Sequence, residues 1–267
     1  MANLDVKGDD ERSNGSDPVK GAARALDLFE AFATARAPLT LTDLAQRIGV
    51  PMSSCHALVR TLHARGYLYY LEQPKRIYPT KRLAAIAQSI ARRDPVFEKL
   101  LPILARLAKA TGETVIVGKM QGDKVIYLDV IEGTHTVRFT AAPGDMAPAH
   151  SSAIGKSTLG LVPDNELDRA IEKLKLSRVT DLTITDREAF KADVIAGRER
   201  GYFVVRGETV DDVTGISIAQ RIGEEIYGIG VAGPTSRLSE NETVYAASLR
   251  EAIAAIARID VELRGNA

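Results

Sequence analysis

Residues 40–66 (TLTDLAQRIGVPMSSCHALVRTLHARG) predict two short helices joined by a tight turn. Thr40 can cap the first helix, and Asp43 places a negative charge in its first turn, where the helix dipole favours it. Gly49 ends this helix, and Pro51 suits the first position of the next helix because its missing N–H is not needed there. The stretch is therefore interpreted as a helix-turn-helix, around which the rest of the fold has to be arranged.

The second predicted helix has one apolar and one polar face. Its apolar residues recur at intervals of three and four positions, the spacing of a face that packs inward; they are Cys55, Leu58, Val59 and Leu62. The opposite face carries short polar or cationic residues near the helix start, where a recognition helix contacts base edges; they are Ser53, His56 and Arg60, beside Met52. The alternative is an ordinary helical hairpin whose polar face is only solvated.

The residues after Gly66 favour the recognition-helix interpretation. Residues 67–78 (YLYYLEQPKRIY) contain two short aromatic and aliphatic runs around a turn at Gln73 and Pro74, which is the pattern of a β-hairpin. Lys75 and Arg76 are expected near the tip of this hairpin. A helix-turn-helix followed by a hairpin with a basic tip predicts a winged helix, so both cations are candidate DNA contacts.

The charge distribution favours a DNA partner although the whole chain is neutral. The sequence holds 35 Lys and Arg and 35 Asp and Glu. Residues 18–93 contain 12 basic and four acidic residues, a net charge of +8, whereas residues 1–17 carry −3 and the remainder −5. A basic segment that coincides with the winged helix is the pattern of a DNA-reading domain joined to one that does not contact DNA.

The length of 267 residues suits two domains, each able to bury its own core. No apolar run is long enough to cross a bilayer, and no signal-peptide pattern is present at the start, so we expect a cytoplasmic protein without a membrane partner. Cys55 is the only cysteine, which excludes an internal disulfide. Its place on the apolar helix face predicts a core residue and not a reactive thiol.

Composition and pattern predict the domain order. Residues 1–17 are small and charged and are expected to be disordered. A winged helix-turn-helix domain is expected at residues 18–80. It includes a support helix at 19–34, whose apolar face would hold Ala22, Ala25, Leu26, Phe29 and Phe32. Residues 81–94 are expected to form a linker helix, and residues 95–263 a larger C-terminal domain.

The C-terminal segment mixes helical and strand patterns. A helix with a leucine-rich face ends at Gly112, and strand-like runs follow at residues 113–120 and 124–132. Residues 136–140 are a candidate third strand. A loop at 141–150 then leads into a helix that begins at Ser151 or Ser152.

The last hundred residues complete the expected fold. Capping boxes at Thr185 and Ser239 predict two helix starts, and Gly201 ends the first of these helices. Strands are expected at 202–205, 215–219 and 226–232, the last two forming a hairpin around Gly223. Helices that flank an antiparallel sheet, an α+β domain, accommodate this order most simply.

An enzyme is the competing interpretation. Residues 155–157 (GKS) resemble part of a phosphate-binding loop, but His150 stands where the first glycine is required, and a Pro/Gly loop precedes it instead of a buried strand. The strained G-x-S-x-G elbow of serine hydrolases does not occur, and no histidine pair has metal-ligand spacing. We predict no catalytic residue, no metal site and no cofactor. A hydrolase or NTPase with an accessory winged helix remains the alternative.

The order of motifs resembles that of IclR-type transcriptional regulators from about residue 19 to 259. The matching segments are residues 24–27 (RALD), 41–51 (LTDLAQRIGVP), 65–68 (RGYL), 112–115 (GETV), 148–150 (PAH) with 155–156 (GK), 200–202 (RGY), 213–216 (VTGI) and 233–238 (GPTSRL). The resemblance implies an N-terminal domain that binds double-stranded operator DNA and a C-terminal domain that binds a small organic effector. It also implies a homodimer or a dimer of dimers.

Two departures from the family pattern bear on the partners. The family often has basic residues at the positions of Met52 and Ala57. DNA contacts here would depend on the remaining residues of the recognition helix and on the hairpin: Ser53, Ser54, His56, Arg60, Lys75 and Arg76. Members that hold small keto acids use polar side chains at four cavity positions that are apolar here: Val205, Gly215, Gly230 and Ala232. This second departure argues against a small, highly charged ligand.

The resemblance also places the effector site. The expected residues are Met146, Ser151, Ser152, Ala153, Ile154, Val205, Gly215, Ile216, Gly230 and Ala232. Apolar walls, two serine hydroxyls and room above two glycines predict a mainly apolar ligand with one polar end, such as an aromatic acid or amide. The alternative is that the glycines only let helix and strands approach closely. An effector that prefers one arrangement of the C-terminal domains would change operator binding through linkage.

Overall fold

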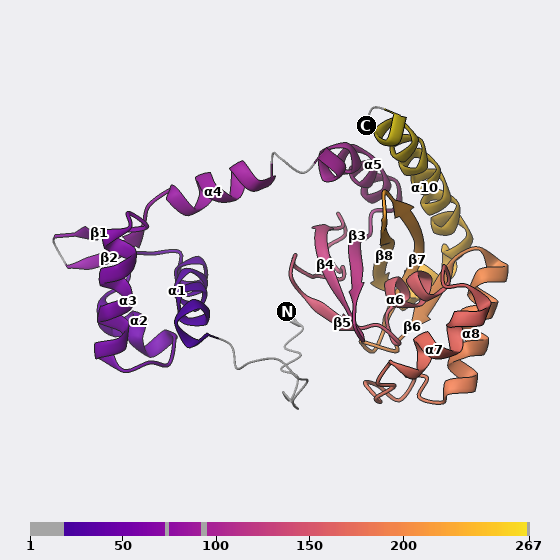
Figure 1. Cartoon of the computed structure of the whole chain (residues 1–267), viewed down its shortest axis with the longest axis horizontal. Coiled ribbons are helices and arrows are strands. Elements are labelled where there is room, and N and C mark those ends of the chain that lie inside the picture. The colour runs from indigo at the N-terminus through magenta and orange to yellow at the C-terminus, as the bar shows by residue number, and fades with distance from the viewer. Residues whose placement is uncertain (1–18, 73–74, 92–94, 266–267) are drawn as a thin grey trace. The chain divides into compact units, whose positions relative to one another are not determined.

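The computed structural model describes residues 19–72, 75–91 and 95–265, which divide into two compact units between residues 95 and 96 (Figure 1). We refer to them as the N-terminal and C-terminal units. The predicted disordered tail, residues 1–17, lies outside the described residues. So do the hairpin turn residues Gln73 and Pro74 and residues 92–94 at the end of the predicted linker helix.

The N-terminal unit is a winged helix, as predicted. Its elements are α1 (Lys20–Ala35), α2 (Leu41–Arg47), α3 (Met52–Ala64), β1 (Leu68–Leu71), β2 (Arg76–Pro79) and α4 (Arg82–Ala91). Strands β1 and β2 pair as an antiparallel hairpin. One core joins the three helices to the hairpin; its most buried members are Leu28, Leu44, Cys55, Val59, Leu68 and Ile77.

Two local predictions for this unit are wrong. Leu26, expected on the buried face of α1, is 64% exposed, whereas Leu28 is fully buried. The face that packs inward is the one shared by Leu28 and Phe32, which lie one helical turn apart. Pro51 is the extended N-cap of α3 and not its first helical residue.

The C-terminal unit is built on a six-stranded antiparallel sheet in the order β5-β4-β3-β8-β7-β6. Its strands are β3 (Thr114–Gln121), β4 (Lys124–Ile131), β5 (Met146–Pro148), β6 (Phe203–Arg206), β7 (Val213–Ile222) and β8 (Glu225–Pro234). Its helices are α5 (Pro95–Thr111), α6 (Ala153–Leu159), α7 (Asp164–Glu172), α8 (Arg187–Arg200), α9 (Thr235–Glu240) and α10 (Glu242–Gly265). The predicted α+β class with an antiparallel sheet is confirmed.

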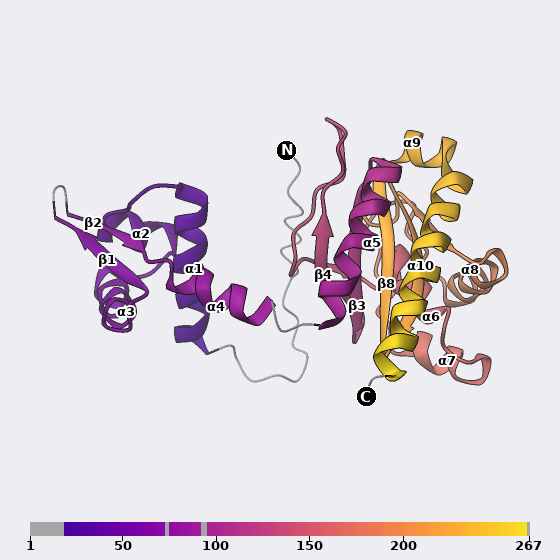
Figure 2. The ribbon, with the colours of Figure 1, turned by 90° about the horizontal axis from the view of Figure 1, so that it is seen from above.

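The two faces of this sheet pack against different helices (Figure 2). Successive strand residues point to opposite faces, so Val115 and Val117 join the core beneath α5 and α10, whereas Ile116 joins the core beneath α6, α7 and α8. Every residue of α6 is buried, because this short helix lies between the sheet and α8. The predicted effector residues belong mainly to the α6 side.

The candidate strand at residues 136–140 is not a strand. Two of its carbonyl oxygens accept hydrogen bonds from side chains instead of from a neighbouring strand. The Arg237 guanidinium donates to the Val137 oxygen at 2.8 Å, and the Thr114 hydroxyl donates to the Phe139 oxygen. The edge strand is β5, inside the segment expected to be a loop. It forms because residues 146–148 pair with the first residues of β4.

Neither predicted capping-box residue in this unit, Thr185 or Ser239, is the N-cap of a helix. Asp186, not Thr185, is the N-cap of α8, and its carboxylate accepts from the Ala189 N–H at 2.8 Å. Ser239 lies inside α9, and the last helix begins at Glu242. Gly201 ends α8 in the left-handed conformation, as predicted, and β7 and β8 form the predicted hairpin around Gly223.

Candidate functional site

The start of α2 is held by a capping box at Thr40, the predicted cap residue. The Thr40 N–H donates to the Asp43 carboxylate at 3.0 Å, and the Asp43 N–H donates to the Thr40 hydroxyl oxygen at 3.1 Å. These hydrogen bonds from Thr40 lower the pKa of Asp43, so the carboxylate is charged and the box is formed at neutral pH. The start of α2 is thereby fixed beside the recognition helix.

Helix α3 presents its polar face to solvent. Cys55, Val59 and Leu62 are buried beneath it, as predicted. The candidate DNA contacts Ser53, His56 and Arg60 are exposed, and Ser54 is half-buried. Burial raises the pKa of the Cys55 thiol, which fits a core residue.

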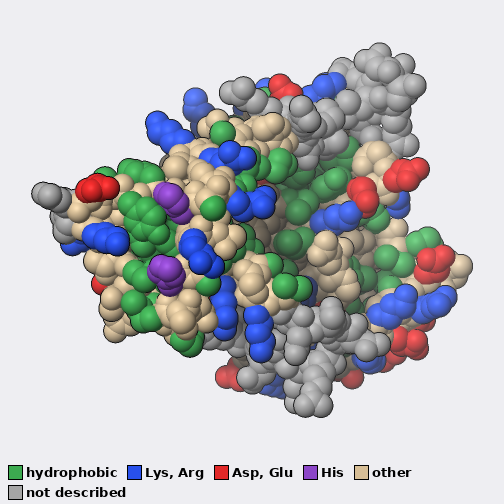
Figure 3. Space-filling model, turned by 60° about the vertical axis from the view of Figure 1, so that its left-hand side comes forward, with side chains coloured by type: hydrophobic (Ala, Val, Ile, Leu, Met, Phe, Trp, Pro, Cys, Tyr) green, Lys and Arg blue, Asp and Glu red, His purple; other side chains and the backbone are tan. Residues whose placement is uncertain are grey.

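The two hairpin cations have different environments. Lys75 is exposed, whereas Arg76 is half-buried and donates to the Pro38 carbonyl at 3.0 Å. Arg76 therefore ties the hairpin to the loop before α2 as well as standing near the hairpin tip. Figure 3 shows Lys, Arg and His side chains gathered on the side of the N-terminal unit that faces the viewer.

In the C-terminal unit, several predicted effector residues fall in direct register across the sheet. Val205 pairs with Gly215, Gly215 with Ala232, and Ala232 with Thr114. We call these four residues the cross-strand row. Residues in register share a face, and Ala232 belongs to the core on the α6 side. Thr114 was not among the predicted site residues, because no sequence pattern pairs β3 with β8.

The first turn of α6 lies over this row. A Cβ atom on Gly215 would lie 3.4 Å from the Ala153 Cβ atom, which is ordinary contact. Ile154 packs tightly against β8 at Gly228, where a Cβ atom would lie only 2.4 Å from its Cγ2 atom. At Gly230 the nearest atoms are the Ile216 carbonyl oxygen at 3.1 Å and the Ser217 Cβ atom at 3.3 Å, both in β7, whereas the Ile154 Cγ1 atom at 3.6 Å is in ordinary contact. Close approach of α6 therefore accounts for Gly228, and the neighbouring strand limits the space at Gly230.

Two predicted effector residues lie elsewhere. Ile216 is fully buried in the core beneath α5 and α10, because it follows Gly215 on the strand and points to the opposite face. Met146 is 51% exposed at the sheet edge, whereas its neighbour Ala147 enters the α6 core. Neither side chain faces the cross-strand row.

The loop before α6 is held by hydroxyl hydrogen bonds. Thr209 donates to the Ser151 carbonyl at 2.6 Å and lies 3.0 Å from the Ser151 hydroxyl. The Ser152 residue is the N-cap of α6, yet its hydroxyl caps no backbone N–H, and it is only 7% exposed. Among the polar groups at the start of α6, Ser152 is the one whose hydroxyl oxygen is available to a ligand.

His150 is a hydrogen-bonding residue at this helix start. It is 1% exposed, and its Nε2 atom lies 2.8 Å from the Ser177 carbonyl oxygen. Burial lowers the pKa of His150, so the imidazole is neutral at pH 7 and Nε2 donates to that carbonyl. Phe139, partly buried against the same core, is a further apolar neighbour that the sequence analysis did not select.

The environment of Lys156 argues against a phosphate-binding loop at residues 155–157. Its Nζ atom is fully buried and donates to Glu208 at 2.7 and 2.9 Å and to Asp193 at 2.7 Å. Three hydrogen bonds use all the donors of an ammonium group, so none remains for a nucleotide phosphate.

The described residues contain no group of three or more His, Cys, Asp or Glu side chains arranged to hold a metal ion. None of the helices in the described ranges has the length and apolar character needed to span a membrane.

Two protein families match consecutive parts of the chain, in the same order as its N-terminal and C-terminal units. Residues 21–72 match the family described as "IclR helix-turn-helix domain", and residues 88–258 match "Bacterial transcriptional regulator IclR C-terminal". The protein belongs to the IclR family. The second match alone spans more than half of the 267 residues, so the predicted resemblance is confirmed.

Individual IclR proteins resemble this chain in sequence or in fold. The chain is 34% identical over 224 residues to the HTH-type transcriptional regulator BhcR of Paracoccus denitrificans (strain Pd 1222), covering 83% of this chain and 80% of that protein. The crystal structure of Thermotoga maritima IclR superposes with a TM-score of 0.76 at 23% identity, over 90% of this chain and 98% of that one. An IclR homologue from Microbacterium hydrocarbonoxydans, complexed with 4-hydroxybenzoate, gives 0.68 at 25% identity, over 92% and 99% of the two chains.

These relatives decide between the two classes of function considered. An IclR protein is a transcriptional regulator with a helix-turn-helix DNA-binding domain and a C-terminal ligand-binding domain, and the named relatives are regulators. The alternative of a hydrolase or NTPase is therefore dropped. This IclR protein is a ligand-responsive DNA-binding regulator.

Proposed function

We propose that residues 18–80 bind operator DNA through α3 and the hairpin, that residues 81–94 link the domains, and that residues 95–263 bind the effector. The observation that carries the DNA part is the exposed polar face of α3 beside an exposed hairpin cation. The proposed contacts are Ser53, Ser54, His56, Arg60, Lys75 and Arg76. Bound effector would change operator affinity by an amount typical of coupled sites, about 1–3 kcal/mol.

The DNA contacts are expected to separate into two classes. Lys75→Ala should weaken binding to all duplexes and reduce the slope of log affinity against log salt by about 0.9, because one phosphate contact is lost. His56→Ala should leave the slope unchanged and reduce discrimination between operator and altered sequences, since a base contact is worth about 1–3 kcal/mol. Fluorescence anisotropy on the protein's own upstream DNA at several salt concentrations measures both.

The matched control is Lys109→Ala, which removes an exposed lysine from α5 of the C-terminal unit. It should leave both the affinity and the slope unchanged. A Lys75→Ala protein with the wild-type slope would contradict the hairpin assignment. Arg76→Ala is a poorer test because it also removes the hydrogen bond to Pro38.

We propose that the effector lies between the start of α6 and the cross-strand row. The Ser152 hydroxyl, buried and without a capping hydrogen bond, would bind its polar end. Val205, Ala232 and Ala153 would contact its apolar part, beside Gly215, where an added Cβ atom meets no heavy atom closer than 3.4 Å. The residues packed around this site would be Ser151, Ile154 and Gly230.

The proposed ligand is a mainly apolar molecule with one polar end, an aromatic acid or amide. Apolar side chains dominate the row, and a few placed polar groups orient ligands in such pockets. The 4-hydroxybenzoate held by the Microbacterium homologue is a molecule of this type and supports the class without identifying the compound.

A thermal-shift screen tests this site. 4-Hydroxybenzoate, benzoate and benzamide are expected to raise the melting temperature, whereas glyoxylate and pyruvate are not. Gly215→Leu should abolish the shift because the new side chain enters the proposed site, and Gly215→Ala should keep it, since its Cβ atom meets no heavy atom closer than 3.4 Å. Ser152→Ala should weaken binding by about 0.5–1.5 kcal/mol through loss of one hydrogen bond.

The control for Ser152→Ala is Ser239→Ala, an exposed serine of α9. It should bind ligand as the wild type does. Stabilisation by glyoxylate or pyruvate alone, or a Gly215→Leu protein that still responds to aromatic compounds, would contradict the proposed pocket.

We also propose that the protein acts in the cytoplasm as a homodimer or a dimer of dimers. Helix α4 supports self-association, because Leu83, Ile86 and Ile90 are 40%, 38% and 69% exposed and recur at helical spacing on one side. Such an apolar stripe is normally covered in a stable protein. A single-chain mass for the full-length protein in light scattering would contradict the proposal.

A further inference from the structure

The cations nearest to the proposed effector site are already bound to carboxylates. Lys156 is the only lysine or arginine that is buried among the described residues. Its Nζ atom uses all three donors of an ammonium group, two for Glu208 and one for Asp193. The Arg237 guanidinium, next to the cross-strand row, is held by the buried carboxylate of Glu113. Both cations are therefore committed before a ligand arrives.

The charges bound to α6 leave an excess of one negative charge. Glu208 and Asp193 carry two negative charges against the single positive charge of Lys156. This cluster is close to Ser152, because Lys156 lies one helical turn further on and its backbone N–H donates to the Ser152 carbonyl at 3.0 Å. Burial raises the pKa of Glu208 against the opposing effect of Lys156, and the charge of Asp193 adds to the rise. The surroundings of the Ser152 hydroxyl thus already disfavour further negative charge.

The remaining polar groups at the start of α6 are uncharged. The Ser152 hydroxyl can both donate and accept a hydrogen bond. His150 is neutral at pH 7 and donates to the Ser177 carbonyl, and Thr209 donates to the Ser151 carbonyl. Helix α6 has seven residues, and even a long helix presents only about half a unit charge at its start. This partial charge does not replace a lysine or an arginine.

A carboxylate that entered this site would lose its hydration without gaining a cation. Burial of an unpaired carboxylate is costly, and such a group is commonly kept neutral by binding a proton. A primary amide carries no charge, and its N–H and C=O groups match the acceptor and the donor of the Ser152 hydroxyl. We propose that the effector is bound with an uncharged polar end, as an amide or a protonated acid, and not as a carboxylate anion. The inference rests on the proposed effector site and adds the charge of its ligand.

Benzamide and benzoate provide the test, because they share one ring and differ in the charge of the polar end. Isothermal titration calorimetry of the full-length protein should give a dissociation constant for benzamide at least about tenfold below that for benzoate at neutral pH. Lowering the pH should strengthen benzoate binding by up to about tenfold per pH unit, because binding then takes up one proton. Benzamide binding, measured in parallel, should not change in this way and corrects for titration of the protein.

An Asp193→Asn variant tests the local excess of negative charge. The amide oxygen at this position can still accept a hydrogen bond from Lys156, so the variant removes the charge alone. The preference for benzamide over benzoate should fall by about threefold or more, because Coulomb repulsion of the carboxylate is reduced. The matched control is Asp168→Asn, at an exposed aspartate of α7, which should keep the wild-type preference. Equal preferences in the two variants would contradict the effect assigned to the charge of Asp193.

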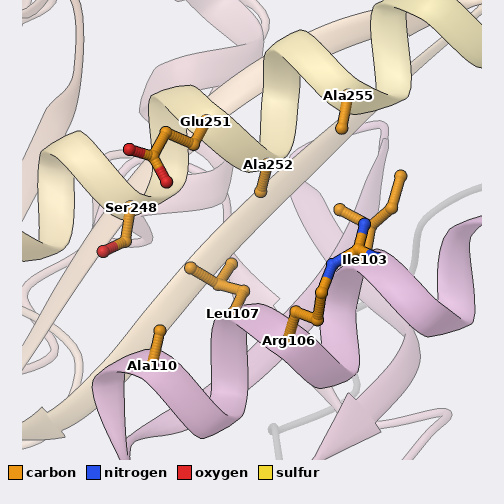
Figure 4. A pocket seen from close by; sticks show the side chains of 8 residues that line it. All are labelled: Ile103, Arg106, Leu107, Ala110, Ser248, Glu251, Ala252 and Ala255. Atoms are coloured by element: carbon orange, nitrogen blue, oxygen red, sulfur yellow. The ribbon is translucent and has the colours of Figure 1, made fainter.

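A second place where benzoate can bind lies on the opposite face of the sheet. Helices α5 and α10 leave a cavity of about 290 Å³ between them, and Arg106 is one of its lining residues (Figure 4). Arg106 is exposed and can attract a carboxylate. The titrations are therefore repeated with Arg106→Met, in which the preference for benzamide should be at least as large as in the wild type.

The possible results distinguish the charge of the ligand from the place where it binds. Benzoate that binds as tightly as benzamide in both the wild type and Arg106→Met, without dependence on pH, would overturn the uncharged polar end and leave the proposed pocket intact. Benzoate binding that is lost in Arg106→Met belongs to the cavity between α5 and α10 and supports the inference. If neither compound binds, the proposed pocket and this inference fail together.

Discussion

A Lys156→Met variant is expected to lose about 3–5 kcal/mol of the free energy of unfolding of the C-terminal unit at neutral pH, because it leaves the buried Glu208 carboxylate without its cation. Lys156 is fully buried, and the side chains of Glu208 and Asp193 that bind it are 8% and 29% exposed. These three residues join α6, α8 and the loop between β6 and β7. Urea denaturation followed by circular dichroism measures the loss, since the chain has no tryptophan.

The loss is expected to depend on pH. Burial raises the pKa of Glu208, and Lys156 opposes that rise, so the pKa of this carboxyl should be higher still in the variant. The folded variant then binds more protons than the unfolded chain, and a state that binds more protons gains stability as the pH falls. The difference from wild type should therefore shrink as the pH falls and the Glu208 carboxyl takes up a proton, and grow as the pH rises.

Two comparison variants make this result specific. Lys191→Met removes the lysine of a surface pair with Asp168, whose side chains are 31% and 66% exposed, and should cost far less stability because water screens such a pair. Combining Lys156→Met with Glu208→Gln removes one of the uncompensated charges and should recover part of the stability. A Lys156→Met protein as stable as Lys191→Met would show that the buried cluster is not needed by the fold.

An Arg237→Met variant is expected to be destabilised by a similar amount, about 3–5 kcal/mol, for the same physical reason. Glu113 is fully buried and accepts from the Arg237 guanidinium at 2.6 and 3.0 Å. A Cβ atom at Gly233 would lie 2.3 Å from the Glu113 carboxylate, so the pair fits only beside a glycine. The variant also loses the hydrogen bond to the Val137 carbonyl that holds the loop after β4.

Arg138→Met is the matched control for Arg237→Met. Arg138 forms two hydrogen bonds to Glu132 at 3.2 and 2.6 Å, but the Glu132 side chain is 54% exposed. Water can solvate that carboxylate once the arginine is gone, so the expected loss is at most about 1 kcal/mol. Equal losses of unfolding free energy in the two variants, measured by urea denaturation at neutral pH, would contradict the argument that burial of the carboxylate determines the loss.

Short-range patterns were sufficient for much of the fold. The start of α2 follows from the Thr40 cap, and α3 follows from its apolar spacing, because these interactions span at most a few residues. The β7–β8 hairpin follows from two strand patterns around Gly223. The same reasoning failed at Thr185 and Ser239, where a neighbouring residue or helix satisfied the backbone instead.

The sequence by itself determined that a basic winged helix precedes an α+β domain, that α3 buries Cys55 and exposes His56, and that Gly201 ends α8, because each depends on neighbours along the chain. Only the tertiary structure decided what lies across the sheet. The register of β6, β7 and β8 put Val205, Gly215 and Ala232 in one row, turned Ile216 to the other face, and brought Thr114 to the site. The tertiary structure also joined Lys156 to Glu208 across 52 positions of sequence. This contact exists only after α6 and the loop between β6 and β7 have packed on the strands and excluded water.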